Sequence, residues 1–290
     1  MAAAGAVSVG ARVRAARQQL RDAGVLADVA DLDARLLAQH LLGWTTERYL
    51  TSAELPEPDG FRSRYEGLLA RRLAREPLAY IVGHREFWGL AICVTPAVLI
   101  PRPETELLVE SVLERFPDRG APIAIADVCT GSGCVAVAIA RERPSARLVA
   151  TDISDGALAV TRCNAERHGV ADRVRLVRAD MLRGLAGCFD AIVANPPYVL
   201  DSDRPALEPE VTRHEPAIAI FAGPDGMSAI EPLVAQAAAL LREGGMLMFE
   251  FGFAQADAVA ELISADADLA LVDFANDLQG IPRIAIARRN

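Results

Sequence analysis

The sequence predicts an α/β protein in which a doubly wound, mostly parallel sheet follows a small helical bundle. From residue 122 onward, short apolar runs typical of buried strands alternate with longer segments of helical spacing. Polar or glycine-rich turns follow those runs, as at the carboxyl ends of parallel strands. Before about residue 80 only helical spacing is found. We therefore predict a helical domain over residues 1–80 and a larger domain over residues 81–290.

The composition is that of a globular protein with a large core. Of 290 residues, 52% are hydrophobic and 24% are charged, enough for one large core or two modest ones. We find no apolar stretch near the roughly 18 residues of a membrane span. Residues 1–10 lack the features of a signal peptide. We expect a cytoplasmic monomer without a membrane partner. The five cysteines form no C-x-x-C pair, so neither a disulfide framework nor a metal site is expected.

The charged residues argue against several classes of function. All 30 basic residues are arginine, so there is no lysine for a Schiff base or for a P-loop. Residues 1–80 hold 11 arginines against 10 acidic residues, whereas the remainder holds 19 against 29. Because a phosphate backbone is bound by Lys and Arg, this acidity argues against direct binding of nucleic acid.

Three amphipathic helices are predicted in the first domain. Capping residues and glycines at their ends set the boundaries. The first helix begins after Ser8 and ends at Gly24, the second ends at Gly43, and the third begins after Asp59 and ends before Pro77. We expect their apolar stripes to form a common core.

The segment between the domains changes character. Aromatic and β-branched residues around Gly83 and Gly89 favour a β-hairpin, and we assign residues 81–101 as this linker. Pro103 then suits the first turn of a helix, where Glu104 is favourable near the positive end of the dipole.

The larger domain alternates strands and helices. Strands are predicted at residues 123–128, 148–151, 174–177, 189–193 and 246–249, and helices at residues 133–140, 154–169 and 227–241. Two final strands, at residues 269–274 and 283–288, have no helix between them. We expect them to form an antiparallel pair at the edge of the sheet.

A glycine-rich loop follows the first strand of this domain, with the sequence Asp127-Val128-Cys129-Thr130-Gly131-Ser132-Gly133. Its two glycines allow a tight turn close to a ligand, and the next helix offers free N–H groups. Gly131, Gly133 and Ala136 also satisfy G-x-G-x-x-A, so a nicotinamide dinucleotide has to be considered. The motif alone is weak.

Polar residues also end the next two strands. Asp152 lies 19 residues after Gly133, where a carboxylate can accept hydrogen bonds from ribose hydroxyls. Asp180 and Met181 offer an acceptor and a soft apolar contact that suit adenine. These strand ends indicate an adenosine site, but they do not separate NAD from S-adenosylmethionine.

The fourth strand ends in Asn195-Pro196-Pro197-Tyr198. The two prolines restrict the backbone to extended or turn conformations. The Asn195 side chain and nearby carbonyl groups can then accept both hydrogens of a planar NH2 group. Dehydrogenases need no such pocket here, whereas methyl transfer to a planar nitrogen does, so this motif favours S-adenosylmethionine.

On these residues the chain resembles the class I S-adenosylmethionine-dependent methyltransferases, which have a Rossmann-like fold. More narrowly, it resembles the release-factor glutamine methyltransferases, the PrmC/HemK family. The resemblance covers almost the whole chain. Besides the glycine loop and the Asn195 motif, it is carried by Pro77–Gly83, Arg85–Leu90, Leu99–Glu106, Glu215-Pro216 and Gly223–Gly226. One departure is Cys129, where the family usually has glycine.

The resemblance implies a reaction and a set of site residues. The enzyme would move a methyl group from S-adenosylmethionine, leaving S-adenosylhomocysteine, to the glutamine amide nitrogen of a Gly-Gly-Gln loop in a peptide chain release factor. Asn195, Pro196 and Tyr198 would be catalytic. Substrate binding would add Pro197, Arg102 and Pro103 to these. The cofactor would be bound by Asp127, Cys129, Thr130, Gly131, Ser132, Gly133, Asp152, Ile153, Asp180, Met181 and Asn195.

The helical domain has its own expected role. One glutamine side chain offers too few contacts for selection from all cellular glutamines. A second folded domain can supply a protein-binding surface of on the order of 800 Å². We therefore expect residues 1–80 to dock the release factor.

Three alternatives remain open from the sequence. An amino-methyltransferase for adenine or cytosine would share Asn-Pro-Pro-Tyr, although the net charge of −9 speaks against it. A methyltransferase for a ribosomal-protein glutamine is a sister activity, but that family differs in the segment around Pro101. A non-catalytic adenosine-binding module would need a broken substrate pocket.

Overall fold

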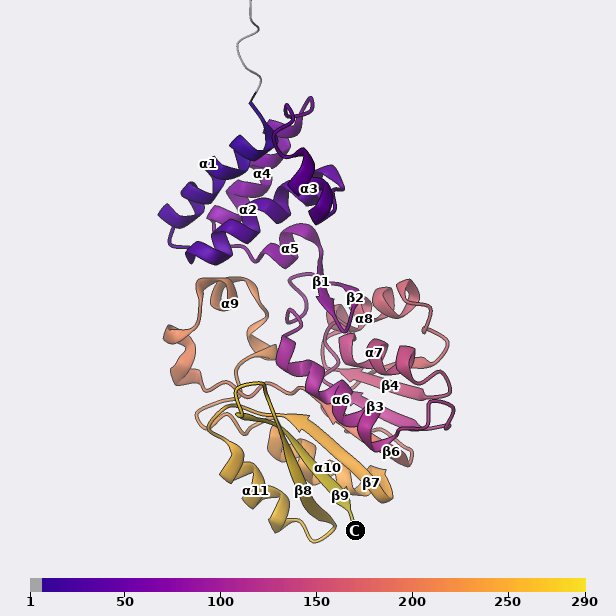
Figure 1. Cartoon of the computed structure of the whole chain (residues 1–290). Coiled ribbons are helices and arrows are strands. Elements are labelled where there is room, and N and C mark those ends of the chain that lie inside the picture. The colour runs from indigo at the N-terminus through magenta and orange to yellow at the C-terminus, as the bar shows by residue number, and fades with distance from the viewer. Residues whose placement is uncertain (1–6) are drawn as a thin grey trace, which may run out of the picture. The chain divides into compact units, whose positions relative to one another are not determined.

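The computed structural model describes residues 7–290, which form two compact units (Figure 1). The helical unit comprises the described residues up to Gly83 together with Pro209–His214. The sheet unit comprises His84–Glu208 and Glu215–Asn290. The prediction on a signal peptide concerns residues 1–10, of which residues 1–6 lie outside the described range. Within residues 7–290, no helix is long and apolar enough to cross a membrane.

The helical unit contains six helices in the part of the chain that the structure describes. They are α1 (Val9–Asp22), α2 (Ala27–Leu42), α3 (Thr46–Ser52), α4 (Phe61–Leu73), α5 (Leu78–Val82) and α9 (Pro209–His214). The predicted cap of α1 is confirmed, because the Ser8 hydroxyl accepts a hydrogen bond from the Ala11 N–H at 3.1 Å. Gly43 ends α2 in the left-handed conformation, also as predicted. Buried apolar side chains from α1, α2 and α4, including Val13, Leu37 and Tyr65, form the core.

Two predictions in this part were wrong. Gly60, not Asp59, precedes α4: it adopts a φ of 74° that glycine tolerates, so the helix starts directly after it. Residues 81–82, assigned to the hairpin, belong to α5, which ends at Gly83. A five-residue helix is too short to show a helical period, and its β-branched residues favoured a strand. The seven-residue α3 was missed for the same reason, since only Tyr49 in it is buried.

A two-stranded hairpin begins the sheet unit. It consists of β1 (His84–Phe87) and β2 (Leu90–Cys93), paired antiparallel. Trp88 and Gly89 form the turn with φ values of 54° and 68°, as in a type I′ turn. The hairpin is thus shorter than the predicted 81–101, because no strand follows Cys93 before residue 101.

The main sheet confirms the predicted doubly wound architecture. Its strand order is β5-β4-β3-β6-β7-β9-β8. Its members are β3 (Ala124–Val128), β4 (Arg147–Asp152), β5 (Val174–Arg178), β6 (Phe189–Ala194), β7 (Leu241–Glu250), β8 (Leu269–Asn276) and β9 (Pro282–Arg289). The pairs from β5 to β7 are parallel, and β9 runs antiparallel to both β7 and β8. Because β3 lies between β4 and β6, the winding reverses there, which is where such sheets bind ligands.

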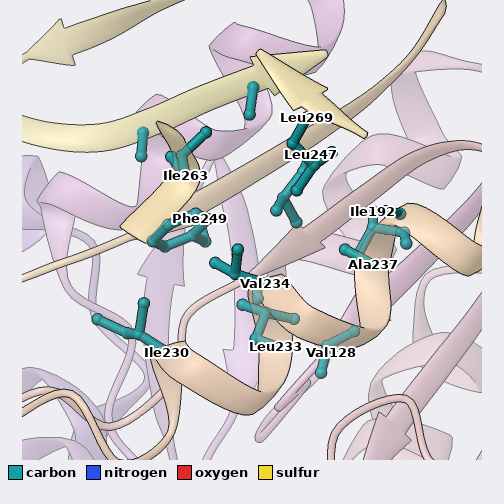
Figure 2. Close-up of a cluster of buried hydrophobic side chains, with 14 of the residues drawn as sticks. Val128, Ile192, Ile230, Leu233, Val234, Ala237, Leu247, Phe249, Ile263 and Leu269 are labelled. Atoms are coloured by element: carbon teal, nitrogen blue, oxygen red, sulfur yellow. The ribbon is translucent and has the colours of Figure 1, made fainter. Parts of the chain in front are cut away.

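Helices accompany this sheet (Figure 1). They are α6 (Glu106–Arg115), α7 (Cys134–Glu142), α8 (Asp155–Arg167), α10 (Ile230–Leu240) and α11 (Ala256–Ala265), with short 3-10 turns at Pro103–Thr105, Asp201–Ala206 and Ala217–Ala219. The predicted Ser154 cap of α8 is confirmed. No helix was predicted at α11. Figure 2 shows side chains of α10, such as Leu233 and Val234, meeting Leu247 and Phe249 of β7, which fixes the strand whose last residue is Glu250.

Candidate active site

A cavity of about 310 Å³ lies in the sheet unit at the carboxyl ends of β3 to β6. Its volume is within the usual range for small-molecule sites. Of the predicted site residues, the following line it: Arg102, Asp127, Cys129, Thr130, Gly131, Ser132, Asp152, Ile153, Asp180, Met181, Asn195 and Pro197. Four strand ends that are distant in the sequence therefore contribute to one cavity.

The glycine loop is held by its own polar groups. Asp127, at the end of β3, accepts a hydrogen bond from the Thr130 hydroxyl at 2.6 Å. Gly133 precedes α7 with a φ of 78°, and a Cβ there would lie 2.6 Å from Cγ2 of Thr161. Only glycine fits at this position. Burial raises the pKa of Asp127 to about 7.

Asp152 connects β4 to this loop. Its Oδ2 accepts a hydrogen bond from the Gly131 N–H at 3.0 Å, and its Oδ1 accepts one from the Ser154 N–H at 2.9 Å. Burial raises the pKa of this carboxyl. Each carboxylate oxygen has a second lone pair, so Asp152 can hold the loop and still accept hydrogen bonds from a ligand in the cavity.

Cys129 and Met181 lie together on the cavity wall, with their sulfur atoms 3.6 Å apart. Both have positive φ values, 57° for Cys129 and 54° for Met181. This conformation costs a non-glycine residue energy, which is a physical reason to expect glycine at position 129, as the resemblance implies. Burial raises the pKa of the Cys129 thiol, so this thiol stays protonated.

Asn195 begins a hydrogen-bonded chain beneath the cavity. Its Nδ2 donates to Oγ1 of Thr105 at 3.0 Å, and Thr105 Oγ1 donates to Oε2 of Glu250 at 2.7 Å. Tyr198 donates its hydroxyl to Oε1 of Glu250 at 2.8 Å. Within residues 7–290, neither Oδ1 of Asn195 nor the carbonyl oxygen of Pro196 accepts a hydrogen bond. Asn195 lines the cavity, so its Oδ1 is available to a ligand there, whereas Pro196 is buried and does not line it.

Arg102 joins two of the segments that carry the resemblance. Its Nη2 donates to Oε1 of Glu215 at 2.5 Å, while Oε2 of Glu215 accepts the Ile100 N–H at 3.0 Å. Glu215 is thereby fixed next to Pro216, which lines the cavity. Ile218, nearby, lines it too and is 63% exposed.

Four predicted residues do not belong to the cavity lining: Pro103, Gly133, Pro196 and Tyr198. Pro196 is buried and Tyr198 is half-buried. Thr105 and Glu250 were not predicted as site residues. Thr105 lies within the Leu99–Glu106 segment, which carries the resemblance, and Glu250 is the polar end of an apolar strand, a pattern that indicates a functional side chain. The remaining lining residues were not predicted: Ala97, Val98, Leu99, Pro101, Thr105, Cys134, Val135, Ser154, Ala157, Ala179, Pro216, Ile218, Ala219, Phe221 and Ser228.

Comparison with known proteins gives matches for both units. Residues 13–83 match the family described as PrmC N-terminal domain, and residues 103–211 match the methyltransferase small domain. A release factor glutamine methyltransferase of Cereibacter sphaeroides is 42% identical over 277 residues, which are 95% of this chain and 96% of that protein. A relative of the same name from Mycolicibacterium smegmatis is 40% identical, covering 96% of each chain.

Among solved structures, a methyltransferase from Pyrococcus furiosus has a similar fold. The TM-score is 0.51 at 18% identity, with 77% of this chain and 98% of that chain covered. At this identity the likeness concerns the fold alone.

Proposed function

The chain belongs to the release factor glutamine methyltransferases, and we propose that it moves a methyl group from S-adenosylmethionine to N5 of the glutamine in the Gly-Gly-Gln motif of a peptide chain release factor. One observation carries this proposal: Asp152 and Asn195 line the same cavity. The first suits an adenosine and the second a carboxamide, so both reactants of the transfer fit one site. The reaction supports translation termination in the cytoplasm.

The residues present fit S-adenosylmethionine. Asp152 can accept the ribose hydroxyls, and Asp180 and Met181 offer polar and apolar contacts for adenine. A Cβ at Gly131 would meet only the Cys129 carbonyl oxygen, at 3.9 Å, so the loop backbone is open to a ligand. The bound cofactor would supply an electrophilic methyl group on a sulfonium.

The protein groups would act mainly by positioning. An amide nitrogen is a poor nucleophile because its lone pair is delocalised into the carbonyl group. Oδ1 of Asn195, which lines the cavity, would accept one of its hydrogens and the Pro196 carbonyl oxygen the other, which would fix the direction of attack. Tyr198 does not line the cavity and its hydroxyl donates to Glu250, so any contact of Tyr198 with the amide would have to come from its ring. A general base is not needed before transfer, since the product can lose a proton to water.

We also propose that the helical unit docks the release factor and that the enzyme acts as a monomer without direct contact to nucleic acid. Leu26 and Leu50 in this unit are exposed, at 66% and 70%, and could contribute apolar contacts. The charge of residues 1–80 is nearly balanced, which suits a protein partner better than a phosphate backbone.

The test is a transfer assay with methyl-labelled S-adenosylmethionine. The full chain is incubated with purified release factor, and the label is mapped by mass spectrometry. Label on the glutamine of Gly-Gly-Gln is expected. Parallel reactions with a release factor carrying Asn in place of that glutamine, and with adenine-containing oligonucleotides, serve as controls. Label on the oligonucleotide, or none on the release factor, would contradict the proposal.

A further inference from the structure

The hydrogen bonds beneath Asn195 have a fixed direction that originates at Glu250. An ionised carboxylate can only accept hydrogen bonds. Both of its donors are hydroxyl groups, Thr105 Oγ1 at 2.7 Å and Tyr198 OH at 2.8 Å. The single hydroxyl proton of Thr105 is therefore committed to Glu250, and towards Asn195 the Thr105 oxygen can only accept.

This direction decides how the Asn195 carboxamide is turned. Only the NH2 end of Asn195 can donate to Thr105, and Nδ2 is indeed the atom found there, at 3.0 Å. The oxygen end is then left for the cavity. If the carboxamide were turned round, its NH2 group would face the NH2 group of the substrate amide, donor against donor. Such a site would bind the substrate nitrogen poorly.

We propose that Glu250, acting through Thr105, is a positioning residue that fixes the acceptor end of Asn195 towards the substrate amide. This inference rests on the proposed function. Glu250 itself touches neither reactant: it does not line the cavity, whereas Thr105 and Asn195 do. Glu250 would raise the fraction of enzyme molecules in which Oδ1 of Asn195 faces the cavity.

The surroundings of Glu250 support this role. The side chain is 1% exposed, and within residues 7–290 no cation forms an ion pair with it. A buried carboxylate without a cation is unfavourable for folding. Arg283 acts on it only at longer range and is bonded to Asp277 at 2.9 Å. Glutamate at this position is thus a poor choice for stability, whereas an obligate acceptor is what Thr105 requires.

The main test compares Thr105→Val with Thr105→Ser in the full chain. Valine keeps the shape but removes the hydroxyl, so kcat at saturating S-adenosylmethionine and release factor should fall by about tenfold or more. Serine keeps the hydroxyl and should recover most of the lost kcat. Affinity for S-adenosylmethionine, measured by calorimetry, should stay within about threefold of wild type, because the Thr105 hydroxyl donates its proton to Glu250 and has none for the cofactor.

Ser111→Ala is the matched control. Ser111 is buried on α6 and does not line the cavity. Its replacement removes a buried hydroxyl six residues from Thr105 and leaves the hydrogen bonds between Asn195, Thr105 and Glu250 in place. Its kcat should match wild type. If the role of Thr105 were purely structural, Thr105→Val would lower the melting temperature, the cofactor affinity and kcat together, and serine would restore all three to the same extent.

A second readout is the pH dependence of kcat. Burial raises the pKa of Glu250, and nearby Glu104 adds to this, whereas the hydroxyls of Thr105 and Tyr198 and the charge of Arg283 lower it. Protonated Glu250 can donate to Thr105 and so release the Thr105 proton towards Asn195. Wild-type kcat should therefore fall on the acid side. In Glu250→Gln one side-chain oxygen remains an acceptor, so kcat should fall less than in Thr105→Val. Because the glutamine side chain does not titrate, the decrease of kcat on the acid side should vanish.

The possible outcomes separate the two proposals. Wild-type enzyme that does not methylate release factor would overturn the proposed function and this inference with it. Active wild-type enzyme with unchanged kcat in Thr105→Val would overturn the inference alone. An acid limb that persists in Glu250→Gln at saturating cofactor would overturn the role of Glu250.

Discussion

Asp152 holds the glycine loop directly, since its Oδ2 accepts the Gly131 N–H at 3.0 Å across a separation of 21 residues. The hydrogen bond joins the ends of the parallel neighbours β3 and β4. One carboxylate thus shapes the loop and faces the cavity in which the cofactor is proposed to bind. We therefore expect loop geometry and ligand affinity to be coupled at this residue.

Replacement of Asp152 by Ala should weaken S-adenosylmethionine binding at least about tenfold, or about 1.4 kcal/mol, because it removes a charged acceptor. Calorimetry measures this directly. Asp155→Ala is the control, since Asp155 is exposed and paired with Arg178 on the surface. Unchanged affinity in Asp152→Ala would exclude the assigned role, and tighter binding of NAD would support the dehydrogenase reading of the glycine motif.

Cys129→Gly should raise the free energy of unfolding by about 1 kcal/mol, because glycine adopts a φ of 57° without strain. The lost contact between the Cys129 and Met181 sulfur atoms limits the gain. Urea denaturation with and without cofactor measures it. Cys134→Gly is the comparison and should be destabilising, since Cys134 is buried at the start of α7. A less stable Cys129→Gly variant would show that the strain is unimportant.

Asp127 should make stability depend on pH. Its folded pKa is raised to about 7 by burial, so the folded state holds a proton that the unfolded state has lost. The contribution of protonated Asp127 to the free energy of unfolding is present in full below the pKa of the unfolded state, about 4. It is lost as the pH rises through about 7. The free energy of unfolding should fall in this range, by at most about 1.4 kcal/mol per pH unit for one proton.

Asp127→Asn should remove that part of the pH dependence. The variant keeps an acceptor for the Thr130 hydroxyl but cannot titrate. The difference between the two unfolding curves, measured from pH 4 to pH 8, isolates Asp127 from the other buried carboxyls. Parallel curves would show that Asp127 is ionised in the folded protein throughout.

The sheet could be predicted from the sequence because its strands contain short apolar runs, and helical segments lie between most of them. The half of the cavity that is proposed to bind the cofactor could be predicted from local motifs, because the glycine loop, Asp152 and Met181 each lie at or just after the end of a strand. The chain of hydrogen bonds from Asn195 through Thr105 to Glu250 could not be predicted in this way. Thr105 is 90 residues from Asn195 and Glu250 is 145 residues from Thr105, and only the folded sheet brings them together.

The helical unit also shows the limit of a local analysis. Its long amphipathic helices were predicted, but α9 was not. This helix begins at Pro209, 126 residues after Gly83, where the first segment of the unit ends. It is held by Glu210, which pairs with Arg72 at 2.8 Å and with Arg75 at 2.6 Å. A six-residue helix between loops carries no periodic signal, and ion pairs over this separation leave no local pattern.

A chain that begins at Leu78 should keep S-adenosylmethionine binding but lose most of its kcat/KM for intact release factor, because the proposed docking surface is removed. Circular dichroism must show that the shortened protein is folded. A short Gly-Gly-Gln peptide serves as the control substrate, for which the loss should be small. If the folded shortened chain methylates intact release factor as well as the full chain does, the helical unit has no docking role.

The most direct test of the account is the rate of methyl transfer by Asn195→Ala. Without the Oδ1 acceptor the substrate amide is neither held nor turned for attack, so kcat should fall by about two orders of magnitude or more. Affinity for S-adenosylmethionine, measured on the same preparation, should change much less. A variant that methylates the release-factor glutamine at nearly the wild-type rate would contradict the account at its centre.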